Sequence, residues 1–398
     1  MNVLRLPSFL LLLVGMIAAA PAGAQSLLAA RGLGLITEPL DGRARGLGGV
    51  GLGLPGFSLS LVNPAGVAGV PAPALLIAFQ PELYSSELRG EQIEGSAARF
   101  PLIHAAFPVG ERWTASVGYG AFLDQNWGVE LADTLQLSDR RIPIVDRFAS
   151  RGGVGRFRVG GAYKVRERLS LGVAADIFTG AAYDTLSRVF GRDSLTGDQI
   201  APSIYGADWT YSGVGAAVGA HWTPMPALNL AAAVSGGGDL RARPEGSDST
   251  VSGRSYALPV HVHLGASGQV ASGTLLALAA EWSGWSSIDG AVAGSGGSRN
   301  AWSLAGGAEW AEPGAEGRST FPLRLGARYA ALPFRWGDAE QAGEFPTERA
   351  LTAGAGARVA GGAALADLAL ERGWRGGEEA FLKESYWRLT VSISLLGR

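Results

Sequence analysis

The segment LSLGVAADI, which runs from Leu169 to Ile177, alternates between two kinds of residue. Every second residue is apolar, and the residues between them are polar or small. Successive side chains of a β-strand point to opposite faces, so this period of two predicts a strand with one apolar and one polar face. The same alternation recurs in VHVHLGAS (260–267), LRLGARY (323–329) and WRLTVSISL (387–395). We therefore expect an all-β protein.

The alternating segments predict an even number of strands, fourteen in all. Tight turns at 108–111, 165–167, 223–225, 269–271 and 360–361 alternate with long connections, and only the link at 312–320 is intermediate. Short turns at one end and long loops at the other are typical of bacterial outer-membrane barrels. The pattern predicts a 14-stranded antiparallel transmembrane β-barrel. Its expected strands are 72–83, 97–107, 112–122, 155–164, 168–178, 208–222, 226–235, 256–268, 272–283, 301–311, 321–331, 350–359, 362–372 and 386–396.

The composition supports a membrane barrel. Of the 398 residues 47% are hydrophobic and 17% are charged, yet past the N-terminus no run approaches the ~20 apolar residues of a membrane helix. Tryptophans on the apolar face gather at two levels, as in the interfacial girdles of a membrane barrel. This favours a membrane barrel over a large soluble β-protein, with the apolar face toward lipid and the polar face toward a lumen. The tryptophans are Trp113, Trp222 and Trp310 beside the tight turns, and Trp282, Trp302 and Trp387 near the other rim.

The N-terminus has the features of an export signal. Arg5 precedes an apolar run from Phe9 to Ala20, and small residues precede Gln25. We expect residues 1–24 to be a cleaved signal peptide. The chain has no cysteine, so neither a lipid-attachment cysteine nor a disulfide is expected. Its 33 basic and 35 acidic residues lack the basic excess of a nucleic-acid-binding surface.

A glycine-rich segment follows the signal. Gly46, Gly48 and Gly51 have GxGxxG spacing, but a dinucleotide fingerprint follows a strand and opens a helix. This segment instead lies between the signal and the first strand, with Pro55 inside it. A segment of this size, rich in apolar and small residues, can fold into a lumen, where small residues let its backbone pack against the wall. We expect a hatch over residues 25–71 that plugs a barrel over residues 72–398.

The segment RARGLGGVGLGLPGFSLSLVNPAGVAGV (43–70) resembles the N-terminal segment of FadL-type outer-membrane transporters of long-chain fatty acids and other hydrophobic compounds. Its Asn63-Pro64-Ala65-Gly66 is similar to the NPA motif of that family's hatch. Residues 258–287 and 322–329 are similar to barrel segments of the family. The resemblance implies a monomer in the outer membrane of a Gram-negative bacterium, in contact with its lipid. It also implies capture of a hydrophobic ligand by outer loops, lumen binding, hatch movement and lateral release.

PorV-type barrels carry a similar hatch segment and serve protein secretion. A secretion or other structural role in the outer membrane is therefore the alternative function. No GxSxG elbow and no HExxH pair occurs, so we expect no enzyme, no catalytic residue and no cofactor.

Candidate residues for ligand capture and ligand binding lie in an outer loop and on the lumen face. Trp127, Leu131 and Leu135 belong to an apolar stretch of the loop at 123–154, which either presents a binding groove or packs onto the mouth of the barrel. Arginines with inward parity can pair with a ligand carboxylate, or with carboxylates of the wall. These arginines are Arg156, Arg158, Arg324 and Arg328.

Two further pairs of inward-facing residues each have two interpretations. Gly118 and Gly120 in the third strand mark a lateral exit, as in the family, or give clearance for the plug. His261 and His263 share a face at strand spacing and are able to bind a metal, but four histidines in the chain and no cysteine favour a polar lining. We therefore expect no metal site.

Overall fold

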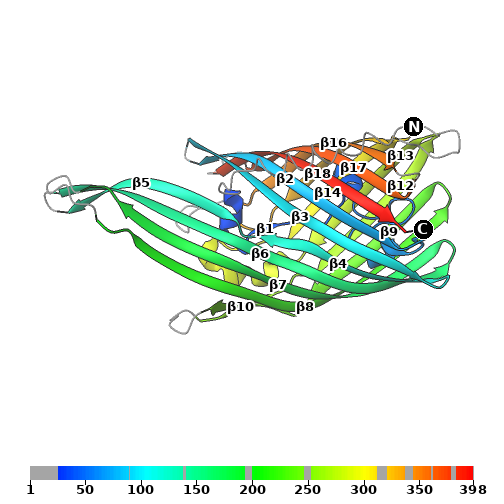
Figure 1. Ribbon diagram of the computed structural model, residues 1–398, viewed down its shortest axis with the longest axis horizontal. Coiled ribbons are helices and arrows are strands. Elements are labelled where there is room, and N and C mark those ends of the chain that lie inside the picture. The colour runs from blue at the N-terminus through cyan, green and yellow to red at the C-terminus, as the bar shows by residue number, and fades with distance from the viewer. Residues whose placement is uncertain are drawn as a thin grey trace.

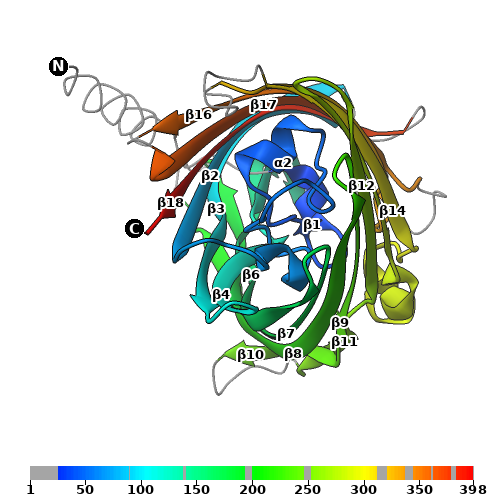
Figure 2. The same cartoon turned by 90° about the vertical axis from the view of Figure 1, so that its right-hand side faces the viewer.

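The computed structural model describes residues 26–397 apart from 89, 138–139, 193–199, 246–251, 312–320, 337–343, 360–361 and 378–381. The expected signal peptide at 1–24 lies outside the described residues. Most of the described chain is β-strand, and the strands surround the N-terminal segment (Figures 1 and 2). Among the described residues, no helix is long and apolar enough to cross a membrane.

Fourteen strands form a closed barrel, as the sequence predicts. Each pairs antiparallel with the next, and β18 pairs with β2 to close the ring. The barrel strands are β2 (Ala74–Leu88), β3 (Glu91–Val109), β4 (Trp113–Asp124), β6 (Arg140–Arg166), β7 (Leu169–Phe190), β8 (Ser203–Met225), β9 (Leu228–Gly237), β12 (His261–Ala271), β13 (Thr274–Ser283), β14 (Ala301–Trp310), β15 (Leu323–Ala331), β16 (Thr347–Val359), β17 (Ala364–Gly376) and β18 (Leu382–Leu396).

Several strands are longer than the sequence pattern indicates. The segment 123–154, expected to be a loop, instead contributes β5 (Trp127–Leu137) and the first part of β6, which pair as a hairpin projecting from one end of the barrel (Figure 1). Two short strands, β10 (Asp239–Glu245) and β11 (Arg254–Ala257), continue the sheet from β8. The strand expected at 256–268 is divided between β11 and β12, because Leu258 and Pro259 interrupt it and proline has no N–H for a ladder.

The two faces of the wall have the predicted orientation. On β7, Val173 is 63% exposed on the outside, whereas Asp176 is 2% exposed on the inside. An apolar outer face suits contact with lipid, and the tryptophans lie on it, each between 42% and 57% exposed. They are the six that the sequence pattern places at two levels: Trp113, Trp222, Trp282, Trp302, Trp310 and Trp387.

The N-terminal segment lies inside the ring of strands (Figure 2). It contains a 3₁₀ turn η1 (Leu27–Ala30), a short strand β1 (Leu35–Ile36), a single helical turn α2 (Gly42–Gly46) and a second 3₁₀ turn η2 (Pro64–Val67). Its apolar residues are buried against the small inner residues of the wall, for example Leu47 against Ala277 and Ala305. A further 3₁₀ element, η3 (Trp285–Ser295), follows β13.

Glycines in the wall give the segment its clearance. A Cβ on Gly326 of β15 would overlap the backbone of Leu47 and Gly48. Gly48 itself has φ +79°, a conformation that side chains other than glycine rarely adopt. Backbone therefore packs on backbone at this point, which accounts for glycine on both sides of the contact.

Candidate functional site: the lumen and its N-terminal segment

The Asn63–Gly66 motif forms a capped turn docked on the wall. Asn63 is the N-cap of η2, and its Oδ1 accepts the N–H of Ala65 at 2.9 Å. Its Nδ2 donates to the carbonyl of Ala220 on β8 at 3.0 Å. Pro64 occupies the first position of the turn, where its missing N–H costs nothing. One side chain thus both closes the turn and holds it to the barrel.

Two glycines form the seat of this turn. Gly172 on β7 and Gly219 on β8 are paired across the two strands. A Cβ on Gly172 would overlap the backbone of Pro64 and Ala65, and one on Gly219 would overlap Asn63 Oδ1. The wall is therefore shaped to the backbone of the motif, with no room for side chains between them.

We expect Asn63→Ala to leave the barrel closed and to loosen this turn. Loss of an N-cap of this kind costs about 1 kcal/mol, and the bond to Ala220 is lost as well. The measurement is limited proteolysis of the N-terminal segment in protein whose heat-modifiable gel mobility shows a folded barrel, combined with uptake of a hydrophobic compound. Wild-type protease resistance and unchanged uptake would contradict the expectation.

A capping hydrogen bond and an ion pair to β14 hold the helical turn α2 in place. The Asp41 carboxylate accepts the N–H of Ala44 at 2.8 Å and caps the turn. Burial raises the pKa of Asp41, although the Ala44 N–H acts in the opposite direction. Arg43 donates to both oxygens of Glu309 on β14, at 3.0 and 2.8 Å. Burial lowers the pKa of the Arg43 guanidinium, but Glu309 more than compensates and the pKa lies above its ordinary value.

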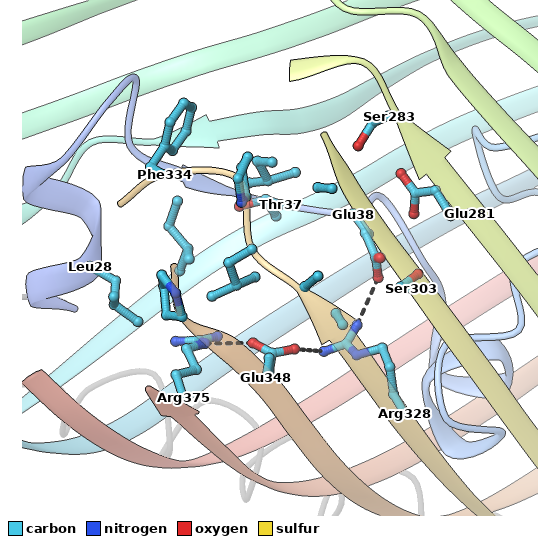
Figure 3. Close-up of a pocket in the computed structure, with 18 of the residues that line it drawn as sticks. Leu28, Thr37, Glu38, Glu281, Ser283, Ser303, Arg328, Phe334, Glu348 and Arg375 are labelled. Atoms are coloured by element: carbon cyan, nitrogen blue, oxygen red, sulfur yellow. Dashed lines mark hydrogen bonds and ion pairs between the residues drawn. The ribbon is translucent and has the colours of Figure 1, made fainter. Parts of the chain in front are cut away.

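A chain of buried charges joins the segment to β15, β16 and β17 (Figure 3). Arg328 donates to Glu38 of the N-terminal segment at 2.9 Å and to Glu371 at 3.0 Å, and it also pairs with Glu348. Glu348 in turn accepts from Arg375 at 2.5 Å. Buried charges need such partners, because an unpaired one is strongly unfavourable. Arg328 therefore holds the N-terminal segment and the wall together.

The four arginines predicted to bind a ligand all face the lumen, but most are engaged within the protein. Arg324 donates to Glu309 and Asp367, each at 2.7 Å. Arg158 makes a bidentate pair with Asp176, at 2.7 and 2.6 Å, and also donates to the carbonyl of Leu61. These pairs, like those of Arg328, fit the interpretation that lumen charges brace the barrel.

Arg156 differs from the other three. Its nearest carboxylate oxygen belongs to Asp176 and is 3.9 Å from Nη1. Its Nε is buried and has no hydrogen-bond partner among the described residues. Arg156 also lines an internal cavity. Arg328 Nε is also buried without a partner among the described residues, but its guanidinium is held by three carboxylates, so Arg156 is the less engaged of the two.

Several cavities lie between the segment and the wall, and two of them are small. One, of about 90 Å³, is lined by Leu28, Thr37 and Phe334 and by the charged chain around Arg328 (Figure 3). The other, of about 60 Å³, is lined by apolar residues and by polar residues from the N-terminal segment and several wall strands. Both are smaller than the ~300–1,000 Å³ of ordinary ligand pockets. The apolar residues of the second cavity include Ile36, Leu40, Leu52, Leu61 and Phe122, and its polar residues include Arg156, His261, His263 and Glu281.

The predicted capture residues lie on the projecting hairpin. Trp127, Leu131 and Leu135 belong to β5, and Leu131 is 48% exposed. Trp127 lines a larger cavity of about 350 Å³ together with Trp209, Tyr256 and residues of the N-terminal segment, among them Leu33 and Gly34. The predicted capture residues line neither of the two small cavities. Gly34 lines both the larger cavity and the cavity of about 90 Å³, so the base of the hairpin adjoins the lumen.

The wall separates between β3 and β4. The ladder joining them stops at the pair Leu102 and Gly120, and the preceding Pro101 has no N–H to continue it. Beyond this point β3 pairs with β2 alone, whereas the end of β4 pairs with β1 of the N-terminal segment. Gly120 faces Pro39 and Leu61 of that segment. The N-terminal segment thus completes the sheet where two wall strands diverge.

Gly118 lies two residues before Gly120 on the same strand. A Cβ there would come within 2.8 Å of the His104 ring, so Gly118 gives clearance to a wall side chain. The two glycines proposed for the exit therefore have different neighbours, and only Gly120 adjoins the N-terminal segment.

Several residues of the charged network are not among those predicted for the site. Glu82 has the inward parity of the expected strand 72–83, so the alternating pattern was a signal for it, whereas Glu348 and Glu384 precede the expected strands 350–359 and 386–396. Glu38 lies in a segment without periodicity, and nothing in the sequence places it beside Arg328.

The closed ring, the apolar outer face and the aromatic levels define a bacterial outer-membrane β-barrel. The chain belongs to the family described as BamG, whose model matches residues 4–235. No curated protein gives a significant sequence match.

Solved structures share the fold. A FadL homologue of Pseudomonas aeruginosa is 13% identical with a TM-score of 0.60, covering 94% of this chain and 99% of that one. CymD, described as a monoaromatic hydrocarbon channel, is 15% identical with a TM-score of 0.57, covering 92% and 99%. The Pseudomonas putida toluene transporter TodX is 14% identical with a TM-score of 0.54, covering 90% and 99%. The descriptions of CymD and TodX name transport proteins and not enzymes.

Proposed function

We propose that this chain is an outer-membrane channel for hydrophobic small molecules, with long-chain fatty acids among the candidate substrates. The observation that carries the proposal is the cavity of about 60 Å³ between the N-terminal segment and the wall, whose lining combines apolar residues with Arg156. A compound with an apolar body and an acidic group matches that lining, because a guanidinium binds a carboxylate well. The descriptions of CymD as a hydrocarbon channel and TodX as a toluene transporter support the apolar body of such a compound, and the acidic group rests on Arg156 alone.

The proposed path has four steps. The exposed apolar residues of β5 capture the compound, and it then reaches the cavity beside Arg156. Because the cavity is small, the N-terminal segment acts as a hatch and moves to admit the compound. Release occurs through the wall where β3 and β4 diverge. If β1 moves away from β4, the end of β4 has no neighbouring strand on the side that faces β3, and a lateral opening results.

A structural or partner-binding role is the second candidate function. It is favoured by the buried ion pairs that hold the segment to the wall, such as Arg43 with Glu309 and Arg328 with Glu38. Breaking several of them at once opposes hatch movement. In this role, the filled lumen stiffens a barrel that serves protein secretion, the function of PorV-type barrels, or another structural purpose in the outer membrane.

Native mass spectrometry of the detergent-extracted protein, followed by lipid extraction, tests the proposal. We expect a retained fatty acid or other apolar compound. Ala305→Phe fills the cavity from β14 and should abolish retention, whereas Leu304→Phe on the outer face of the same strand should retain the compound. Retention that both variants share would locate the compound in the detergent belt, and a stable protein partner without a small molecule would favour the second function.

A further inference from the structure

Three side chains with metal-binding atoms converge on the lumen. His261 and His263 lie on β12, and Glu281 lies on the neighbouring β13. The register pairs His263 directly with Glu281, and His261 with Ser283 two residues further along β13. All three side chains therefore point to the same side of the wall. The position of Glu281, which strand spacing alone does not give, changes the interpretation of the two histidines.

The distances in this cluster are long for hydrogen bonds and also suit a shared ion, although His261 Nδ1 and Glu281 Oε1 make a weak hydrogen bond. His261 Nδ1 is 3.4 Å from Glu281 Oε1, and His263 Nδ1 is 3.8 Å from Glu281 Oε2. Good N–H···O bonds measure about 2.7–3.2 Å. Tetrahedral ligands at about 2.0–2.1 Å from a zinc ion are roughly 3.3 Å apart. One ligand atom from each residue can be chosen so that all lie within 4.8 Å of one another.

The surroundings leave the cluster incomplete. Among the described residues, His261 Nε2 is buried and has no hydrogen-bond partner. The cluster also borders the cavity of about 60 Å³, which has room for an ion with a water molecule. Aromatic rings pack against the cluster, since Phe122 and Trp285 make edge-type contacts with the His261 imidazole, and Phe122 also lines the cavity. These contacts fix the His261 ring at the border of the cavity.

We propose that His261, His263 and Glu281 bind one divalent transition-metal ion, with Zn²⁺ as the preferred ion. Two imidazoles and a carboxylate are a donor set typical of zinc, and three protein ligands leave the fourth position for water or another small ligand. That position faces the cavity lined by Ile36 and Leu40 of the N-terminal segment. Metal binding at this wall site is independent of whether the barrel transports hydrophobic compounds.

Nearby charges set the expected affinity. Arg156 and Arg328 line the same cavity, and their positive charges oppose a cation at the cluster, whereas Glu38 on that cavity acts in the opposite direction. The site should therefore be weaker than a closed structural zinc site. Arg156→Gln should strengthen metal binding, an effect in the direction opposite to that of general damage to the fold.

The experiment uses the full-length protein without a histidine tag, extracted in detergent and stripped with a chelator. Zn²⁺ is titrated by calorimetry, bound metal is counted by elemental mass spectrometry, and Co²⁺ is added for its visible spectrum. The variants are His263→Ala, Glu281→Gln and Arg156→Gln. His221→Ala, a wall histidine on β8 outside the cluster, is the matched control. Heat-modifiable gel mobility reports whether each variant forms a barrel.

We expect one Zn²⁺ per chain and a tetrahedral Co²⁺ spectrum. His263→Ala and Glu281→Gln should weaken binding by at least the ~10–100-fold that loss of a supporting residue costs a metal site. His221→Ala should bind as the wild type does. Substoichiometric binding by the wild type would overturn the proposal even if a variant failed to fold. Equal affinity in wild type and folded His263→Ala would do the same.

Discussion

Gly172→Val should displace the Asn63–Gly66 turn from the wall and make the barrel leak. The added side chain would occupy the space of the Pro64 and Ala65 backbone, and neither β7 nor the turn can yield by a side-chain rotation. Overpacking typically costs 1–3 kcal/mol, and ~3 kcal/mol shifts an equilibrium by roughly 100-fold. The measurement is conductance in planar bilayers, with protease sensitivity of residues 26–73 as a second reading.

Gly268→Val is the matched control for this substitution. Gly268 lies on β12, and the nearest atom to a Cβ there is the Ala227 carbonyl oxygen at 3.8 Å, an ordinary contact. Gly268→Val should conduct as the wild type does. A leak found only in Gly172→Val would therefore result from displacement of the Asn63–Gly66 turn and not from a valine in the wall as such. Wild-type conductance and protease resistance in a folded Gly172→Val barrel would show that the turn still docks on the wall, and would contradict the role assigned to Gly172.

The fold follows from short-range patterns, which explains why the sequence predicts it well. The two-residue period, as in 169–177, determines which face of a strand is apolar. The regular exchange of tight turns and long connections indicates that strands consecutive in the sequence are neighbours in the barrel. Extensions beyond the membrane lack that signal. Pro143 near the start of β6 and the Gly152-Gly153 pair at its middle interrupt the pattern, so the sequence predicts a loop where the strand is continuous.

The site was predictable only in part, because its contacts join residues distant in sequence. Strand parity correctly turns Arg324 and Arg328 inward, but parity cannot choose their partners. The partner Glu38 comes from a segment whose path in the lumen depends on glycine clearances at several strands. Likewise, the pairing of His263 with Glu281 depends on the register of β12 and β13, which no local pattern specifies.

Arg328→Met should strongly destabilise the barrel. The substitution keeps an unbranched side chain but leaves the carboxylates of Glu38, Glu348 and Glu371 without their shared cation. Removing one partner from a buried ion pair costs about 3–5 kcal/mol. The measurement is the midpoint of urea unfolding in detergent, followed by tryptophan fluorescence. Protease sensitivity of the N-terminal segment should rise together with the loss of stability, because Glu38 is its link to Arg328.

Two further variants distinguish a structural role of Arg328 from a role in ligand binding. Arg147→Met removes an exposed pair with Glu130 and should leave the midpoint unchanged, since exposed pairs contribute little. Adding Glu348→Gln to Arg328→Met should restore part of the stability, because it removes one of the stranded charges while Arg375 keeps Glu82 and Glu384. A ligand-binding Arg328 predicts a different result, namely wild-type stability in Arg328→Met with loss of the retained compound. That outcome would return Arg328 to the candidate ligand site beside Arg156.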